Sequence, residues 1–100
     1  MKIINTHPGQ ILVKEFLDPP NISEKRLAEE LKLSYESIQS ITKGKSPITA
    51  NIALRLSRFF GNTPQFWLNL QSTYDLRETI EEIDDELSLI VEYEKQKSNP

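Results

Sequence analysis

Two helix-start signals that lie one short segment apart constrain this chain more than any other feature of its sequence. Ser23 and Ser34 are both favourable N-cap residues, because a serine hydroxyl accepts a hydrogen bond from a backbone N–H group of the first helical turn. Each cap also lies between two apolar residues that can form a hydrophobic staple. The staple pairs are Ile22 with Leu27 and Leu33 with Ile38. The sequence therefore predicts two short helices joined by a tight turn.

Proline, glycine and threonine mark the ends of three further helices. The predicted boundaries are His7-Pro8-Gly9 to Asp18-Pro19-Pro20 for the first helix, Gly44 for the end of the third, Thr49 to Gly61 for the fourth and Thr63-Pro64 for the start of the fifth. Apolar residues repeat at helical spacing in each segment, and only Ile3-Ile4 hints at a strand. We therefore expect an all-α fold with five helices in the first three quarters of the chain.

An aromatic stripe follows the start of the fifth helix. Phe66, Trp67 and Tyr74 lie at helical spacing beside Leu70. Such a stripe is typical of packing against other helices, so we predict that these rings belong to the core and do not form a ligand pocket.

The composition excludes several classes of function. The 100 residues suffice for one compact domain, and the longest apolar runs, such as Ile11-Leu12-Val13, have three residues, far fewer than the roughly 20 of a membrane span. No apolar stretch of signal-peptide length follows Met1. The absence of cysteine and the single histidine, His7, exclude thiolate chemistry and multi-histidine metal sites. No carboxylates form a recognisable acid–base pair. We therefore expect a cytoplasmic protein that is not an enzyme and needs no cofactor, metal or membrane.

The charge is unevenly divided along the chain. Residues 1–74 contain nine Lys or Arg and six Asp or Glu, a net charge of +3, whereas residues 75–100 contain three and nine, a net charge of −6. No acidic residue lies between Ser37 and Tyr74. The basic residues of that stretch are Lys43, Lys45, Arg55 and Arg58. This pattern favours a basic surface and an acidic tail, and the alternative is a chance distribution in a short chain.

The last quarter of the chain has a heptad pattern. Its apolar positions, spaced alternately four and three residues apart, are Leu76, Ile80, Ile83, Leu87 and Ile90. The residues between them are mostly acidic, and the stripe is too short for an independent coiled coil. It must therefore dock on its own domain, on a second copy or on another protein. We divide the chain into a helix-turn-helix domain over residues 1–76 and an acidic amphipathic C-terminal helix and tail over residues 77–100.

The second short helix is the candidate for DNA recognition, because two short helices joined by a tight turn present their second helix to the major groove. If Ile38 and Ile41 point inward, the residues around them face outward. These candidates for base readout are Tyr35, Glu36, Ser37, Gln39 and Ser40. Gln39 can form two hydrogen bonds with adenine, whereas Glu36 is repelled by phosphate and lowers non-specific binding. The alternative for each residue is an ordinary solvated helix surface.

Basic residues flank the turn after this helix. Lys43 and Lys45 lie on either side of Gly44, where phosphates of a bound duplex would pass. The residues that we predict to contact phosphate are Ser23, Lys25, Lys43 and Lys45.

Residues from His7 to Leu76 carry a resemblance to a known family. The stretch from Ser23 to Ile41 resembles the helix-turn-helix of Cro/repressor-like (XRE) proteins, and the longer run is similar to HigA (VapI) antitoxins of bacterial toxin–antitoxin modules. The motifs that carry this similarity are His7-Pro8-Gly9, Glu15-Phe16-Leu17, Gly44-Lys45, Ile48-Thr49-Ala50, Ala53-Leu54-Arg55-Leu56, Phe59-Phe60-Gly61 and the run from Pro64 through Phe66-Trp67-Leu68-Asn69-Leu70-Gln71 to Tyr74-Asp75-Leu76. The sequence departs from the pattern in two places. Lys32 replaces a turn glycine, and Tyr35-Glu36-Ser37 stands at the start of the recognition helix, which is often rich in Arg and Asn in this family.

The resemblance implies two roles. One is neutralisation of a HigB-type toxin, typically a ribosome-dependent mRNA endonuclease, and the other is repression of the module's own promoter by a homodimer bound to operator DNA. One alternative is a stand-alone transcriptional repressor without a toxin partner, and another is an interaction module that no longer binds DNA. The basic stretch argues against the last alternative, and the acidic tail favours a basic protein partner.

Overall fold

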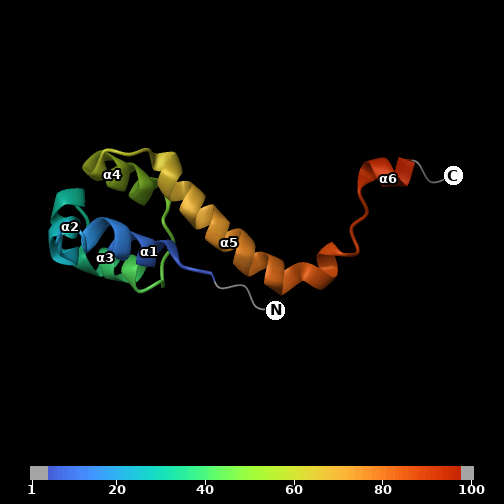
Figure 1. The fold of residues 1–100 in the computed structure, drawn as a ribbon, viewed down its shortest axis with the longest axis horizontal. Helices are drawn as coiled ribbons and strands as arrows, with labels where there is room; N and C mark the ends of the chain where they lie inside the picture. The colour runs from blue at the N-terminus through green and yellow to red at the C-terminus, as the bar shows by residue number, and fades with distance from the viewer. Residues whose placement is uncertain (1–4, 98–100) are drawn as a thin grey trace.

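The structure is a computed structural model that describes residues 5–97, and every regular element among these residues is a helix (Figure 1). The α-helices are α1 (Pro8–Ile11), α2 (Glu24–Leu31), α3 (Tyr35–Thr42), α4 (Ala50–Phe60), α5 (Pro64–Leu87) and α6 (Tyr93–Lys97), and a π-helical segment, η1 (Leu12–Leu17), continues α1. The predicted all-α fold is confirmed. The Ile3-Ile4 signal lies outside the described residues.

The predicted N-caps form in the structure. In each case the hydroxyl of the cap residue accepts a hydrogen bond from the backbone N–H group three positions later. The pairs are Ser23 with Arg26, Ser34 with Ser37, Thr49 with Ile52 and Thr63 with Phe66. Because these bonds satisfy N–H groups that a helix cannot pair internally, they fix where α2, α3, α4 and α5 begin.

The turn between α2 and α3 contains a strained residue. Lys32, the C-cap of α2, has φ 60° and ψ 43°, the left-handed conformation that glycine adopts most readily. A lysine there costs about 1 kcal/mol relative to glycine. Arg55 of α4 supports this turn, because its Nη1 donates to the carbonyl oxygens of Leu31 and Lys32 at 2.7 and 3.4 Å. Asn51 holds the same guanidinium through Nε at 2.7 Å.

One hydrophobic core joins α1, η1, α2, α3, α4 and the first half of α5. Its buried apolar side chains are Leu12, Leu17, Leu27, Ala28, Leu31, Ile38, Ile41, Ile48, Ala53, Leu56 and Trp67. Ile38 and Ile41 are the inward face of α3, as the sequence predicts. Ala28 is buried on α2, which packs against α3 and α4, and its small side chain suits this close packing.

The aromatic stripe of α5 divides between core and surface. Trp67 is fully buried in the core, as predicted. Tyr74 is half-buried and does not belong to the core cluster, because its ring packs edge-on against His7. Phe66 is 38 % exposed, and the prediction that it is a core residue is wrong. Its ring lies at the edge of the core, with its centroid 5.7 Å from that of Phe16 and 5.1 Å from that of Trp67. The helix turns this position toward the rim because Trp67, its neighbour, occupies the interior.

Helix α5 extends well beyond the core and gives the molecule its elongated shape. The described residues span 63 × 27 × 22 Å, and Figure 1 shows the distal half of α5 pointing away from α1–α4. Residues 77–87 continue α5 without a break at residue 76, where the sequence analysis ends the helix-turn-helix domain. Only Ile83 departs from helical geometry, with φ −119° and ψ 18°.

The apolar stripe of the C-terminal quarter does not fold back on its own domain. Leu76 is 61 % exposed, and Ile80, Leu87 and Ile90 are exposed as well, while Ile83 is half-buried. Ile90 lies after the end of α5, so the heptad pattern continues past the helix that it predicts. Of the three docking possibilities, a second copy and another protein remain. Within residues 5–97, no helix is long and apolar enough to cross a membrane.

The histidine of the His7-Pro8-Gly9 motif caps α1. Its Nδ1 accepts a hydrogen bond from the backbone N–H of Gly9 at 2.9 Å, which requires that Nδ1 carry no proton. The ring stands edge-on to Tyr74, with the centroids 4.9 Å apart. Partial burial lowers the pKa of His7 from its ordinary value of 6.5, and the nearby carboxylate of Asp75 opposes part of this shift.

We expect the domain to lose stability as the pH falls through the ordinary histidine pKa of 6.5. Below that pH the unfolded chain binds a proton that the folded His7 binds less readily, so protonation favours unfolding. His7→Asn keeps an acceptor for the cap and removes the titration, so its stability should change less over the same range. Urea denaturation between about pH 7.5 and 5.5 measures both proteins. Equal pH dependence of the two would contradict this role of His7.

Candidate nucleic-acid interface

Helix α3 presents a polar face opposite its buried isoleucines. Tyr35, Glu36 and Ser37 are exposed, whereas Gln39 and Ser40 are half-buried. None of the five candidates for base readout belongs to the buried core, and the side chain of Tyr35 is 42 % exposed. Glu36 is the acidic residue of the first helical turn, where the helix dipole favours a negative charge.

Gln39 and Tyr35 contact each other across one turn of α3. The Nε2 of Gln39 donates to the hydroxyl oxygen of Tyr35 at 2.9 Å. An amide nitrogen carries two hydrogens, so this bond leaves one N–H and the Oε1 atom available. Adenine is recognised by one such donor and one such acceptor. The contact therefore restrains Gln39 without consuming the groups that base recognition needs.

The two serine candidates are already bonded within the domain. Ser37 Oγ lies 2.8 Å from Ser34 Oγ, the N-cap hydroxyl. Ser40 Oγ forms a short hydrogen bond with Ser46 Oγ, and the carbonyl oxygen of Ser40 accepts from the backbone N–H groups of Lys45 and Ser46 at 2.8 and 3.1 Å. Ser40 thus holds the loop after α3 in place through hydrogen bonds. This role was not predicted from the sequence. The serine pair offers no pattern in sequence that distinguishes it from ordinary loop residues.

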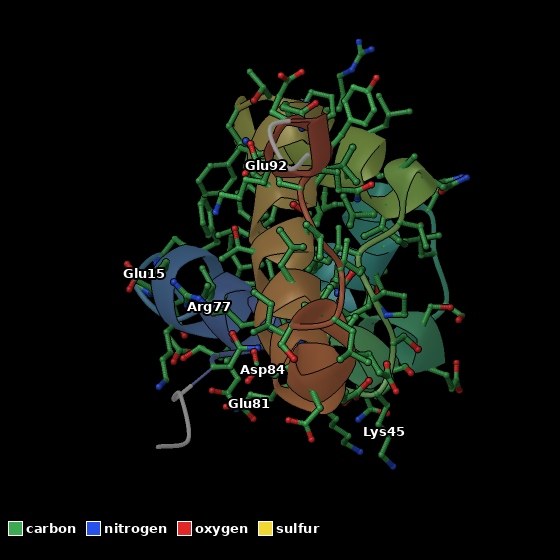
Figure 2. All side chains as sticks on the ribbon, turned by 90° about the vertical axis from the view of Figure 1, so that its right-hand side faces the viewer. Glu15, Lys45, Arg77, Glu81, Asp84 and Glu92 are labelled. Atoms are coloured by element: carbon green, nitrogen blue, oxygen red, sulfur yellow. The ribbon has the colours of Figure 1, made fainter. Side chains whose placement is uncertain are left out.

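Lys43 and Lys45 lie on the loop after α3 that Ser40 holds in place. Lys43 is the C-cap of α3, Gly44 follows with φ 75°, and both lysines are exposed. Figure 2 shows Lys45 on the lower side of the molecule, well apart from Glu92 of the acidic tail. The backbone N–H groups of Lys43 and Lys45 are satisfied within the protein, so the side chains are the groups that can reach a phosphate.

Ser23 and Lys25 lie at the start of α2. The Ser23 hydroxyl is exposed and already caps the helix by accepting from Arg26, and Lys25 is exposed in the first turn. A helix N-terminus favours phosphate, since its backbone N–H groups and dipole point toward the anion. Glu24 occupies the same turn and counters part of this attraction. The geometry brings all four phosphate candidates to exposed positions at the ends of α2 and α3.

A buried glutamine from α5 positions the start of α4. Gln71 is only 7 % exposed, and its Oε1 accepts from the backbone N–H of Ile48 at 2.7 Å. Its Nε2 donates to Asp75 Oδ1 at 2.9 Å, so both ends of the amide are paired. The loop that carries Lys45 is therefore held from α3 by Ser40 and from α5 by Gln71. Gln71 belongs to the motif that starts at Pro64, but nothing in the sequence predicts this contact with the loop.

Between α3 and α4 the surface is hollowed beside the readout face. This open hollow of about 510 Å³ is lined by Glu36, Ser37, Ser40, Ile41, Ser46, Pro47, Thr49 and Ile52. Its lining is dominated by hydroxyls and apolar groups, with one carboxylate. Within residues 5–97, no cluster of His, Cys, Asp or Glu could hold a metal ion. The hollow is suited to contact with a polar ligand that has a grooved surface. Its lining contains no nucleophile beside a general base.

Comparison with known proteins agrees with this geometry. A family model described as helix-turn-helix matches residues 13–67. Virulence-associated protein I of Dichelobacter nodosus is 46 % identical over 71 residues, which cover 71 % of this chain and 66 % of that protein. Antitoxin HigA-1 of Vibrio cholerae is 39 % identical over 71 residues, which cover 71 % of this chain and 67 % of that protein.

Solved structures extend the similarity to most of the chain. The Pseudomonas aeruginosa antitoxin HigA, solved with the higBA promoter, matches with a TM-score of 0.84 and 37 % identity, covering 90 % of this chain and 98 % of that one. An addiction module antidote protein of the HigA family from Coxiella burnetii matches with a TM-score of 0.85 and 36 % identity, covering 91 % and 100 %. Three of these four proteins are named as antitoxins or as an antidote protein, and one as a virulence-associated protein. The chain therefore belongs to the XRE-type helix-turn-helix family and, within it, to the HigA/VapI group.

Proposed function

We propose that this protein is the antitoxin of a type II toxin–antitoxin module and that it represses its own operon by binding operator DNA. The observation that carries the proposal is the readout face of α3 beside the exposed Lys43 and Lys45 on a loop fixed by Ser40 and Gln71. The relative from P. aeruginosa, solved with the higBA promoter, supports DNA as the ligand.

The DNA-binding form in this proposal is a homodimer. Helix α3 has 8 residues, so one copy can contact only a few base pairs. Two copies related by a two-fold axis would read palindromic half-sites about 34 to 36 Å apart, one turn of the duplex. Sedimentation of the protein with and without a duplex from its own upstream region tests this stoichiometry. A monomer bound to that duplex would contradict it.

The toxin partner in this proposal is a HigB-type mRNA endonuclease. An RNA-cleaving protein needs a basic surface, and residues 75–100 of this chain carry a net charge of −6. The exposed stripe along the distal half of α5 adds apolar area to that charge. We infer that residues after Tyr74 act in toxin contact, in dimerisation or in both.

Co-expression with the product of the adjacent gene tests the toxin role. The full chain should restore growth and co-purify with a small basic protein, and a chain that ends at Tyr74 should lose rescue or dimer mass. If no neighbouring product is toxic while the chain still binds its upstream DNA, the second candidate function, a stand-alone repressor, replaces the first. The basic stretch from Ser37 to Tyr74 favours a stand-alone repressor over an interaction module that no longer binds DNA.

Substitutions at the proposed interface should separate specificity from affinity. We expect Gln39→Ala to reduce the preference for the operator over other sequences, with a loss of about 1 to 3 kcal/mol at one base pair per half-site. Lys43→Ala should weaken binding to all sequences and lower the slope of log K against log salt by about one for each phosphate that the side chain neutralises, and Lys45→Ala should do the same. Anisotropy titrations over several salt concentrations measure both quantities. An unchanged operator preference in Gln39→Ala would show that the readout face lies elsewhere.

A further inference from the structure

A groove between α2 and α4 is lined by none of the residues that we propose as DNA contacts. This groove, which we call the α2–α4 groove, has an open volume of about 520 Å³ and is lined by Glu30, Leu31, Leu54, Arg55, Arg58 and Phe59. Leu54 is 59 % exposed although it lies in the middle of a packed helix, and Phe59 is only half-buried. The α2–α4 groove thus has an apolar surface that the domain itself does not cover.

The rim of the α2–α4 groove is basic. Two guanidinium groups and one carboxylate line it. Arg55 is engaged with the carbonyl oxygens of Leu31 and Lys32, so its position is fixed, while Arg58 is exposed. An apolar surface with arginines at its edge fits a peptide that combines apolar side chains with carboxylates.

The segment of residues 89–94 has this composition. Leu89 and Ile90 are 79 % and 72 % exposed, and Val91 is exposed beside them. Glu92 and Glu94 follow within three positions and are also exposed. Residues 90–92 form neither helix nor turn, so this part of the chain can be accommodated in an extended groove. Exposed apolar side chains next to each other favour burial against a partner.

This segment cannot reach the groove of its own chain. The α2–α4 groove lies beside the end of α4, from which α5 starts, whereas the segment follows the other end of α5. Helix α5 rises about 36 Å over its 24 residues. The four residues after Leu87, up to Val91, span at most about 14 Å. Figure 1 shows α2 and α4 at one end of the molecule and α6 at the other, so an occupant from this sequence must come from a second copy.

We propose that residues 89–94 of one copy dock in the α2–α4 groove of a second copy, with Leu89, Ile90 and Val91 on the apolar surface and the following carboxylates at Arg58. The proposal rests on the homodimer proposed above and names the surfaces that form it. A two-fold exchange would run the distal halves of two α5 helices past each other. The exposed side chains that this arrangement brings together are Leu76, Ile80 and Leu87.

Cysteine cross-linking tests the exchange, because the chain has no cysteine of its own. A chain with Leu54→Cys is mixed with a differently tagged chain with Val91→Cys and oxidised. We expect a heterodimer linked by a disulfide bond, which a reductant should cleave. The control replaces Leu54→Cys with Lys14→Cys, an exposed position on η1 outside the groove, and should give no more than background linkage.

The outcomes of this experiment separate two failures. A chain that is dimeric but cross-links no better than the Lys14→Cys control overturns the groove proposal and leaves the homodimer in place. A chain that is monomeric at every concentration overturns both. Linkage of Val91→Cys to a co-expressed toxin in preference to the Leu54→Cys chain also overturns it, since the segment then binds a different protein.

Charge reversal gives a second test that does not depend on cysteine. Arg58→Glu should raise the dissociation constant of the dimer about five- to tenfold, because an exchanged dimer contains the contact twice. The double substitution Glu92→Lys and Glu94→Lys should weaken it similarly, and combining it with Arg58→Glu should restore association. Lys14→Glu, which reverses an exposed charge elsewhere, is the matched control. Additive losses without recovery would contradict the pairing.

Discussion

Trp67→Ala is expected to remove about 3 to 5 kcal/mol from the free energy of unfolding, a large part of the stability of so small a domain. Trp67 is fully buried, and its ring centroid lies 4.7 Å from that of Phe16 and 6.0 Å from that of Phe60. Its Nε1 donates to Asn62 Oδ1 at 2.9 Å, so truncation removes a hydrogen bond as well as packing. Urea denaturation followed by circular dichroism measures the loss.

Phe66→Ala provides the matched comparison, because the neighbouring ring is 38 % exposed. Its loss should be clearly smaller, since less apolar area leaves water when the domain folds. Near-normal stability of Trp67→Ala, or equal losses for the two variants, would contradict the assignment of Trp67 to the centre of the core.

Gly9→Ala is expected to be the second severe substitution. A Cβ atom built on Gly9 would lie 1.9 Å from the carbonyl oxygen and 2.8 Å from the carbonyl carbon of Ile41. Both atoms belong to the backbone of α3, so no rotamer change can relieve the clash and α1 must move away. Overpacking of this kind costs about 1 to 3 kcal/mol or more. The same shift would disturb the end of α3 that leads into Lys43, so DNA affinity should fall with stability.

Gly61→Ala serves as the control for the loss of a glycine. Gly61 ends α4 with φ 75°, and a Cβ there would meet no atom within 4 Å. Its substitution should therefore cost only the backbone strain of about 1 kcal/mol. If thermal unfolding shows Gly9→Ala to be no worse than Gly61→Ala, the close approach of α1 and α3 is not what requires glycine at position 9.

Local signals predicted the helices well, because caps and stops act within a few residues. Ser23, Ser34, Thr49 and Thr63 all accept the bonds expected of them, and the glycine at position 61 ends α4. The left-handed conformation at Lys32 is also the one that a missing turn glycine implies. These features depend on backbone geometry that each short segment determines by itself.

Contacts between distant residues could not be predicted in the same way. The bonds from Arg55 to the end of α2 and from Gln71 to Ile48 join residues that only the packed fold brings together. The exposure of Phe66 likewise depends on how α5 is rotated against the core. The periodicity of apolar residues predicts that one face of a helix is buried, but it does not determine which residue lies at the edge of that buried face.

The sequence contains a signal that α5 continues past residue 76. No glycine or proline lies between residues 65 and 87, so no residue of either type interrupts a helix that starts at Pro64 before α5 ends at Leu87. The heptad pattern from Leu76 instead suggested a separate helix. The division at residue 76 remains a prediction about function, since the structure runs one helix through it.

The affinity of the full chain for DNA from upstream of its own gene tests the central proposal most directly. Fluorescence anisotropy at a defined salt concentration would compare that duplex with a shuffled duplex of equal length and composition. We predict binding of two chains per duplex at least about 10³-fold tighter to the upstream sequence, with a linear fall of log K against log salt. Equal affinity for the two duplexes would contradict the proposal, because the readout face of α3 would then carry no sequence information.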